Sequence, residues 1–253
     1  SKEGFIRQVI GWREFMKHVH DLTEGFRQLA DGKRKTVKRP GDGGYKTWTG
    51  KGWKSIARLK DIDGGASVSF FDVYTPLPPA FWGEPSGLNC LDTVIDSVWS
   101  EAWSHHITRL MILSNIATLM DYSPRELTDW FWIAYNDAYD WVVEPNVLGM
   151  GTFATGKLFT TKPYVAGSSY IKRMSDYCKK CRFPPTTNCP IKRLYWAFFA
   201  RHQDKLKDNP RLKMPMNSMT RRSKNDRNLD QDVFETVRRK LEKAEQVLPE
   251  DMP

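Results

Sequence analysis

The sequence predicts an all-α fold. Apolar residues recur at helical spacing in several long segments, and no segment alternates apolar and polar residues as a half-buried strand does. Ser123-Pro124 forms a typical helix start, with a capping hydroxyl before a proline. The chain has 253 residues, 40% of them hydrophobic and 13% aromatic, so it can bury a sizeable core. No apolar run approaches the ~20 residues that cross a bilayer, so no membrane span is expected.

The expected helices follow one another along the chain. In the first, Phe5, Val9 and Val19 recur at near-helical spacing, and the last is amphipathic. Residues 144–168 are expected to form a loop because they contain Pro145, Pro163 and four glycines. A polar, basic stretch at 213–229 is expected to separate the last two helices. The predicted helices cover residues 3–29, 91–120, 124–141, 168–178, 190–208 and 230–247.

The net charge is concentrated in one segment. Residues 31–60 hold ten basic and two acidic side chains, which is a net +8 out of the chain's +9. Because glycines are also dense there, residues 31–80 are interpreted as a basic, glycine-rich insertion. Basic side chains there would neutralise nucleic-acid phosphates, and tryptophans would stack on unpaired bases. The candidate nucleic-acid residues are Lys33, Arg34, Lys35, Lys38, Arg39, Lys46, Trp48, Lys51, Trp53 and Lys54. A solvated loop, or a contact with an acidic protein, would account for the same composition.

The cysteines indicate a metal centre. Cys178, Cys181 and Cys189 lie within twelve residues, and Cys90 brings the number to four. A disulfide framework would need more cysteines in a chain of this length. Tetrahedral zinc and a [4Fe–4S] cluster both take four thiolates, so the spacing leaves these two open. Buried free thiols remain the non-metal alternative.

Several stretches together resemble one known family, the iron–sulfur bacterial cryptochromes and photolyases. These stretches are residues 4–15 (GFIRQVIGWREF), 88–90 (LNC), 105–111 (HHITRLM), 137–141 (DAYDW), 145–147 (PNV), 162–164 (KPY), 170–178 (YIKRMSDYC) and 194–196 (LYW). The resemblance runs from residue 4 to about 215, apart from the basic insertion.

The resemblance implies a photolyase/cryptochrome C-terminal helical domain that binds FAD and transfers an electron to a pyrimidine lesion in DNA under light. Residues 1–30 and 81–215 would form this domain, followed by a basic linker and C-terminal helix at 216–253. It also implies a [4Fe–4S] cluster on all four cysteines.

Further site residues follow from the resemblance alone. It places the lesion beside His105, His106 and Arg109, and it assigns electron transfer to Trp82 and Trp130. Phe131 stands where the family has a tyrosine, and phenylalanine is much harder to oxidise. Flavin contacts are implied for Trp12, Arg13, Glu14, Asp137, Asp140 and Asn146. On pattern alone these residues would instead be ordinary core, cap and surface positions.

Two departures from the family support a second hypothesis. The sequence starts after the family's antenna domain and after the segment that holds the FAD phosphates, so flavin affinity is expected to fall steeply unless a partner chain supplies that part. The basic insertion is also unusually large. The alternative is therefore a flavin-less, cluster-stabilised structural subunit of a large RNA–protein assembly, such as an organellar ribosome, that binds RNA through the insertion.

Overall fold

The computed structural model describes residues 1–23, 26 and 68–253, and it confirms the all-α class. Every regular element in these ranges is a helix, and the only strand-like feature among them is an isolated bridge between Thr75 and Tyr122. No helix in the described part of the chain is long and apolar enough to cross a membrane. The basic residues at 31–60 that were expected to bind nucleic acid lie outside the described residues.

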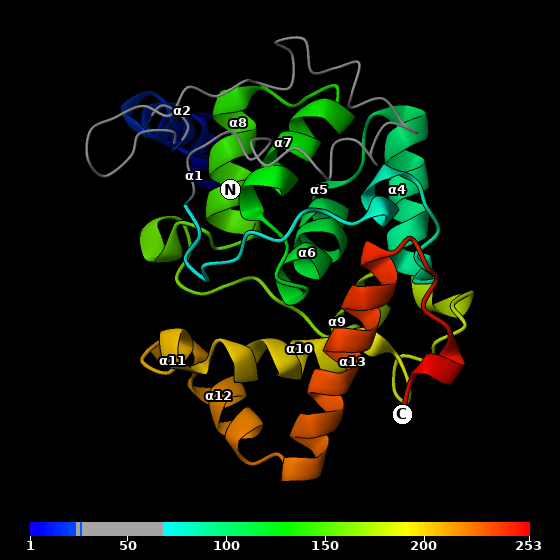
Figure 1. The fold of residues 1–253 in the computed structure, drawn as a ribbon. Helices are drawn as coiled ribbons and strands as arrows, with labels where there is room; N and C mark the ends of the chain where they lie inside the picture. Colours follow the sequence, from blue (N-terminus) through cyan, green and yellow to red (C-terminus); the bar gives the residue numbers. More distant parts are fainter. Residues whose placement is uncertain (24–25, 27–67) are drawn as a thin grey trace.

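The α-helices follow in chain order (Figure 1). They are α1 Lys2–Ile6, α2 Trp12–Thr23, α4 Asn89–Glu101, α5 His106–Thr108, α6 Asn115–Leu119, α7 Pro124–Ala134, α8 Asp140–Glu144, α9 Ser168–Met174, α10 Pro190–Arg201, α11 Gln203–Leu206, α12 Lys213–Thr220 and α13 Lys224–Glu242. Short 3-10 helices cover Pro79–Trp82, Gly156–Leu158, Tyr177–Lys179, Pro210–Leu212 and Pro249–Asp251.

Three further helical segments have wide π turns, at Arg7–Gly11, Arg109–Ser114 and Pro145–Gly151. The first joins α1 and α2 into one continuous helix, the second links α5 to α6, and the third extends α8. Short π-helical segments inside α-helices are rare and are frequently found at functional sites. The third segment corrects the expectation of a loop from residue 144 onward.

Two other helix predictions also differ from the structure. The helix expected over 91–120 is interrupted because Ala102 adopts a left-handed backbone with φ of 52°. The chain then restarts at α5, where Nδ1 of His105 accepts a hydrogen bond from the Ile107 amide at 3.1 Å. The helix expected over 124–141 ends at Ala134, which leaves Asp137 in the turn before α8.

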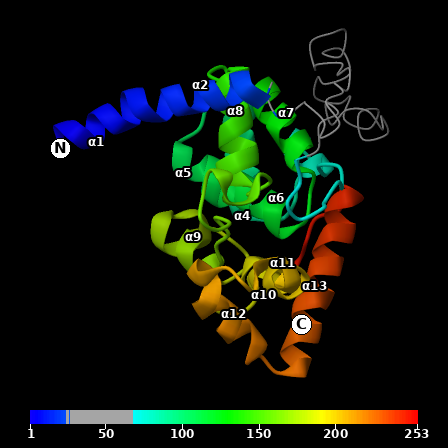
Figure 2. The same ribbon diagram turned by 90° about the vertical axis from the view of Figure 1, so that its left-hand side faces the viewer.

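The polar stretch expected at 213–229 is largely helical. Helix α12 buries Met216 and Met219, and Ser223 caps α13 by accepting a hydrogen bond from the Asp226 amide at 3.0 Å. The views in Figures 1 and 2 show α13 beside α10. Buried Phe234 and Val237 of α13 belong to the same core cluster as the apolar residues of α10, so this segment completes the main core.

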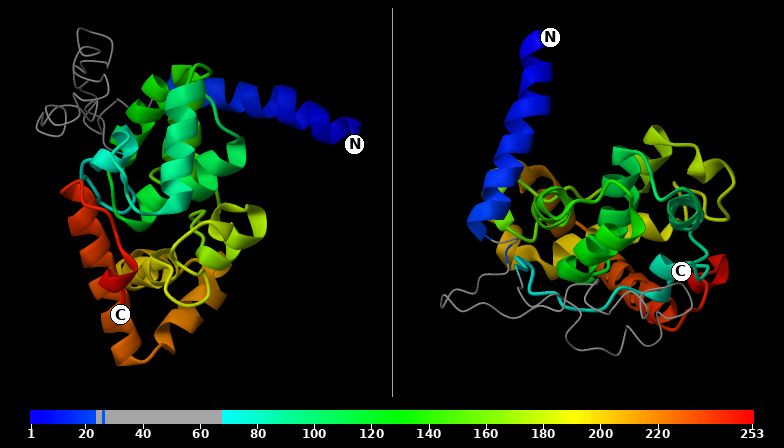
Figure 3. Two further views of the ribbon diagram at one scale, coloured as in Figure 1. Left: turned by 90° about the vertical axis from the view of Figure 1, so that its right-hand side faces the viewer. Right: turned by 90° about the horizontal axis from the view of Figure 1, so that it is seen from above.

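The N-terminal helix extends away from the body of the molecule (Figures 2 and 3). None of the residues from Lys2 to Gly11 is buried, and Phe5 is 68% exposed. The C-terminal half of this helix lies against α8, where buried Met16 anchors it. This second half therefore packs against the body of the described chain.

Candidate functional site

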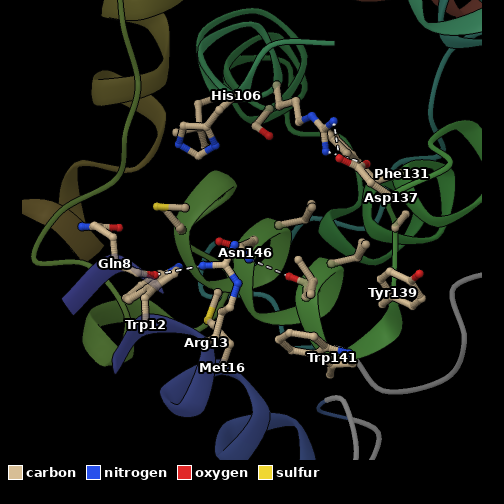
Figure 4. A pocket seen from close by; sticks show the side chains of 18 of the residues that line it. Gln8, Trp12, Arg13, Met16, His106, Phe131, Asp137, Tyr139, Trp141 and Asn146 are labelled. Atoms are coloured by element: carbon tan, nitrogen blue, oxygen red, sulfur yellow. Dashed lines mark hydrogen bonds and ion pairs between the residues drawn. The ribbon is translucent and has the colours of Figure 1, made fainter. Parts of the chain in front are cut away.

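The main candidate site is a pocket of about 970 Å³ to which all three π segments contribute (Figure 4). Figure 4 shows His106 on one wall, Trp12 and Arg13 on the opposite wall, and Asn146 between them. The volume lies at the upper end of the range for small-molecule and cofactor sites. The lining residues are Gln8, Val9, Trp12, Arg13, Met16, His106, Arg109, Leu110, Ser114, Phe131, Asp137, Ala138, Tyr139, Trp141, Val142, Val143, Asn146, Val147 and Met150.

Close packing of two π segments forms one end of the pocket. A Cβ added at Gly151 would lie 2.7 Å from Oγ of Ser114, so a larger residue here would require the Ser114 side chain to move. Asn115, directly after Ser114, is fully buried and exchanges two hydrogen bonds with the backbone of Ala166, at 3.0 and 2.8 Å. These contacts fix the wall that carries Arg109 and Leu110.

An ion pair links two of the predicted site residues within one wall of the pocket. Both terminal nitrogens of Arg109 bind the carboxylate of Asp137, at 3.0 and 2.9 Å. The Nε of Arg109 donates to the carbonyl of Ser104 at 3.0 Å, and its guanidinium lies 4.1 Å from the centre of the Tyr135 ring. Such bidentate arginine–carboxylate pairs have a fixed geometry. The pair therefore holds the turn before α8 against the start of α5.

The two adjacent histidines have different positions. His106 lines the pocket, and burial, together with the charges of Arg109 and His105, lowers its pKa from the ordinary 6.5. His106 is therefore neutral at pH 7. His105 is outside the lining and serves as the cap of α5.

Some of the other predicted flavin contacts line the pocket and some do not. Arg13 lines the pocket and donates to the carbonyl of Gln8 at 3.0 Å, and Asn146 donates to the carbonyl of Val142 at 2.7 Å. This bond uses one amide hydrogen of Asn146 and leaves the amide oxygen and the second hydrogen for a bound molecule. Glu14 and Asp140 are outside the lining, and Glu14 is 67% exposed beside His18.

Several lining residues were missed by the sequence reasoning. Gln8 and Met16 lie one turn on either side of Trp12, so helical spacing alone would have placed them on the same face. Ser114 is five residues after Arg109, and only the wide turn brings both to the pocket. The residue types in Arg109–Ser114 do not predict a π turn.

A buried charged cluster connects helices that carry pocket residues. The guanidinium of Arg125, on α7, contacts the carboxylates of Asp129 at 2.8 Å and Glu144 at 3.2 Å. Glu144 also meets Nδ1 of His20, on α2, at 2.8 Å. Burial by itself lowers the pKa of Arg125, but the two carboxylates raise it above its ordinary value. The cluster thus joins the three helices α2, α7 and α8.

The four cysteines form a second candidate site. All four thiols are free, and Cys90 and Cys189 are buried. Burial raises the pKa of Cys90, and the nearby charges of Cys189, Cys181 and Cys178 raise it further. Burial likewise raises the pKa of Cys189 to about 12. The four sulfurs are thus close enough for their charges to interact.

Two helix starts face these thiols. Cys90 is in the first turn of α4 and Cys189 caps α10, so partial positive charges of both helices lie beside the sulfurs. Asn89 binds the carbonyl of Tyr177 at 2.9 Å, which connects α4 to the segment carrying Cys178. Among the described residues, no group of three or more His, Cys, Asp and Glu side chains is arranged to hold a metal ion.

Trp82 and Trp130 lie outside the pocket lining, in the core beneath Phe131. Trp130 is fully buried, and its ring centre lies 5.4 Å from that of Phe131. The ring of Trp99 lies between the two tryptophans, 5.9 Å from Trp82 and 6.2 Å from Trp130. The two predicted tryptophans thus both contact Trp99.

Comparison with known proteins identifies two relatives. The chain is 37% identical to a (6-4) photolyase of Agrobacterium fabrum over 226 residues, which are 87% of this chain and 37% of that photolyase. It is 35% identical over 102 residues to the uncharacterized protein R855 of Acanthamoeba polyphaga mimivirus, covering 40% of this chain and 80% of R855. No model of a protein family matches the chain. The chain is therefore similar to a part of a (6-4) photolyase that makes up 37% of that protein's length, and every regular element among its described residues is a helix.

Proposed function

We propose that this chain binds FAD in the main pocket and uses light to transfer an electron from the flavin to a pyrimidine lesion in DNA. One observation carries the proposal: a single pocket of about 970 Å³ brings together residues from four separate parts of the sequence that the resemblance assigns to flavin and lesion. These residues are Trp12, Arg13, His106, Arg109, Asp137 and Asn146. The chain spans 37% of the length of the photolyase, so the activity of that protein is a proposal for this chain.

The pocket residues fit a flavin. Aromatic and aliphatic side chains such as Trp12, Phe131 and Val147 provide walls for a flat ring system, and Asn146 offers an acceptor and a donor to the ring's polar edge. Arg13 provides positive charge for an electron-rich ring or a phosphate, whereas the charge of Arg109 is paired with Asp137. A bound flavin would supply the light absorption and the transferable electron.

His106 is proposed to hold a proton for the lesion. Its lowered pKa keeps it neutral, so that it can both donate and accept one hydrogen bond. Because a negatively charged group nearby raises the pKa of a histidine, an approaching DNA phosphate would favour the protonated form. Arg109, one turn further on, would then orient the same end of the lesion.

A [4Fe–4S] cluster on Cys90, Cys178, Cys181 and Cys189 is part of the proposal. The four thiols lie close enough for their charges to interact, and a [4Fe–4S] cluster takes four thiolate ligands. The partial charges of two helix starts would offset part of the negative charge of four thiolates. The cluster would join α4, the 177–189 segment and α10.

Nucleic-acid binding by residues 31–60 is proposed to serve the same reaction. The net charge of +8 in this segment suits a DNA phosphate backbone. Neither relative is named as part of an RNA–protein assembly, so no separate structural role in such a particle is proposed.

A visible absorption spectrum of the protein, purified anaerobically from its source, tests the proposal first. Resolved flavin bands above a broad iron–sulfur absorption are expected. The same protein should then convert a (6-4) photoproduct in an oligonucleotide under blue light and leave it unchanged in the dark. Flavin bands without repair would limit the function to light sensing, and absence of flavin would refute the proposal.

A further inference from the structure

A separate pocket of about 560 Å³ lies beside the C-terminal half of α13, and we call it the proline pocket. Residues 74–79 form one side of it, and Arg238 and Glu242 form the other. Figures 1 and 2 show the segment before the 3-10 helix Pro79–Trp82 next to the end of α13. The volume is within the range of small-molecule sites. None of its lining residues lines the main pocket, so the two sites are distinct.

The side formed by residues 74–79 is an apolar wall with little freedom to move. Proline rings fix the backbone at Pro76 and Pro78. The carbonyl of Thr75 accepts a hydrogen bond from the amide of Ser123 at 2.7 Å, which ties the wall to the start of α7. Tyr74 is 53% exposed at the edge of the pocket. An exposed aromatic ring beside proline rings offers a surface on which a planar ring can stack.

The opposite side carries one positive and one negative charge. The Nε of Arg238 donates to Oε1 of Glu242 at 2.8 Å, and Nη2 of Arg238 donates to the hydroxyl of Thr75. Within the part of the chain that the structure describes, Nη1 of Arg238 and Oε2 of Glu242 make no further hydrogen bond. The two side chains are 30% and 42% exposed. The pair therefore offers a bound molecule one donor and one acceptor next to each other.

A buried hydroxyl on the core side of the proline pocket has no partner. Tyr122 is 2% exposed, and its hydroxyl makes no hydrogen bond among the described residues. Tyr122 is bridged to Thr75 through the backbone. Burial raises the pKa of this hydroxyl, Glu242 raises it further and Arg238 lowers it, so both charges lie near it. An unpaired buried hydroxyl costs free energy, and a polar group held between Arg238 and Glu242 would lower that cost.

We propose that the proline pocket binds a planar heterocycle whose edge has a carbonyl oxygen beside two N–H donors, as guanine has. The carbonyl would accept from Arg238, the N–H groups would donate to the carboxylate of Glu242, and the ring would lie on the wall of residues 74–79. Hydrogen bonds to a charged carboxylate are the strong ones. Adenine has an amino group and a bare ring nitrogen on the corresponding edge, so donor would meet donor and acceptor would meet acceptor. This site does not depend on a flavin in the main pocket.

Isothermal titration calorimetry of the full chain with GMP tests the site. GMP is expected to bind at least about tenfold more tightly than AMP, because the mismatched edge of adenine leaves polar groups unpaired. Glu242→Gln should weaken GMP binding by about tenfold or more, because it removes the charge and puts a donor in place of one acceptor. Asp232→Asn is the matched control, since Asp232 is exposed on the same helix outside the pocket. Equal affinities for GMP and AMP, or for Glu242→Gln and wild type, would overturn the proposal.

Two further measurements identify the source of the guanine and exclude the main pocket. Tighter binding of the oligonucleotide TTGTT than of GMP, with a preference over TTATT that Glu242→Gln removes, would assign the site to a base in single-stranded DNA. Binding of GMP without that preference would assign it to a free nucleotide. Asn146→Ala should bind GMP as wild type does, because Asn146 lines the main pocket alone. Loss of GMP binding in Asn146→Ala but not in Glu242→Gln would refute the site. Absence of flavin together with GMP binding that requires Glu242 would refute the proposed function alone.

Discussion

Replacement of Gly87 by alanine should disrupt the contact between the C-terminal tail and the start of α4. Gly87 has φ of +81°, and a Cβ at this position would lie 2.2 Å from the carbonyl oxygen of Val247. That oxygen belongs to backbone and cannot rotate away. Val247 is fully buried, and its amide donates to the carbonyl of Ser86 at 2.9 Å. The tail must therefore move when the methyl group is added.

The expected cost separates into two parts. The left-handed backbone costs any residue other than glycine about 1–2 kcal/mol. Displacement of the tail adds the burial of a valine side chain, about 1.5–3 kcal/mol, and one hydrogen bond, about 0.5–1.5 kcal/mol. Gly83 provides a matched control, because it has φ of +95° with nothing within 4 Å of an added Cβ. Gly83→Ala should show the backbone cost alone.

Urea unfolding followed by circular dichroism measures both variants. Gly87→Ala is expected to be less stable than Gly83→Ala by about 2–4 kcal/mol, or on the order of 10 °C in Tm. Equal losses in the two variants would refute the reasoning, because backbone strain would then account for the whole effect and the tail contact would contribute nothing.

Three further predictions concern the two sites. The pKa of His106 is lower in the folded protein than in the unfolded chain, so below about pH 6.5 the unfolded chain binds more protons than the folded protein. The free energy of unfolding should therefore decrease as the pH falls below 6.5 and increase toward neutral pH. In His106→Asn the urea midpoint should vary less between about pH 5 and 7, and curves parallel to wild type would contradict this. Cys178→Ser should lose iron, acid-labile sulfide and the broad visible absorption, with Ser175→Ala as control; unchanged iron would exclude this ligand. Asn146→Ala should weaken flavin binding by about tenfold, whereas exposed Asn136→Ala should not, and equal flavin content in both would argue against Asn146 as a contact.

The class of the fold and most helix positions could be predicted from the sequence because apolar residues recur at helical spacing. Breaks and wide turns in the helices are harder to predict from the sequence. Ala102 is a good helix former, yet it adopts the left-handed conformation that ends α4. The π turn Pro145–Gly151 contains one proline and two glycines, a composition typical of a loop, yet the segment is helical. In both places tertiary packing overrides local preference.

The site could be predicted where one helix carries the residues, and not where partners come from distant segments. Trp12 and Arg13 share a pocket as adjacent helical residues can, whereas Glu14 follows them in sequence but faces solvent. Arg109 and Asp137 are 28 residues apart, and their pairing depends on how α5 meets the turn before α8. Arg125 follows a helix start and would be expected on the surface. Its burial between two carboxylates follows only from how α7 and α8 pack.

The wide turns make the shape of the pocket depend on chain length as well as on residue identity. A π turn contains about one residue more than an α turn, and one residue corresponds to about 100° of rotation around a helix. Deleting a single residue from Pro145–Gly151 would let the segment relax to an α-helix and rotate the side chains beyond the deletion away from their present directions. A one-residue deletion there would reshape the pocket while every lining side chain kept its chemistry. For engineering or evolution of this fold, insertions and deletions in these three turns are therefore a separate means of changing what the pocket accepts.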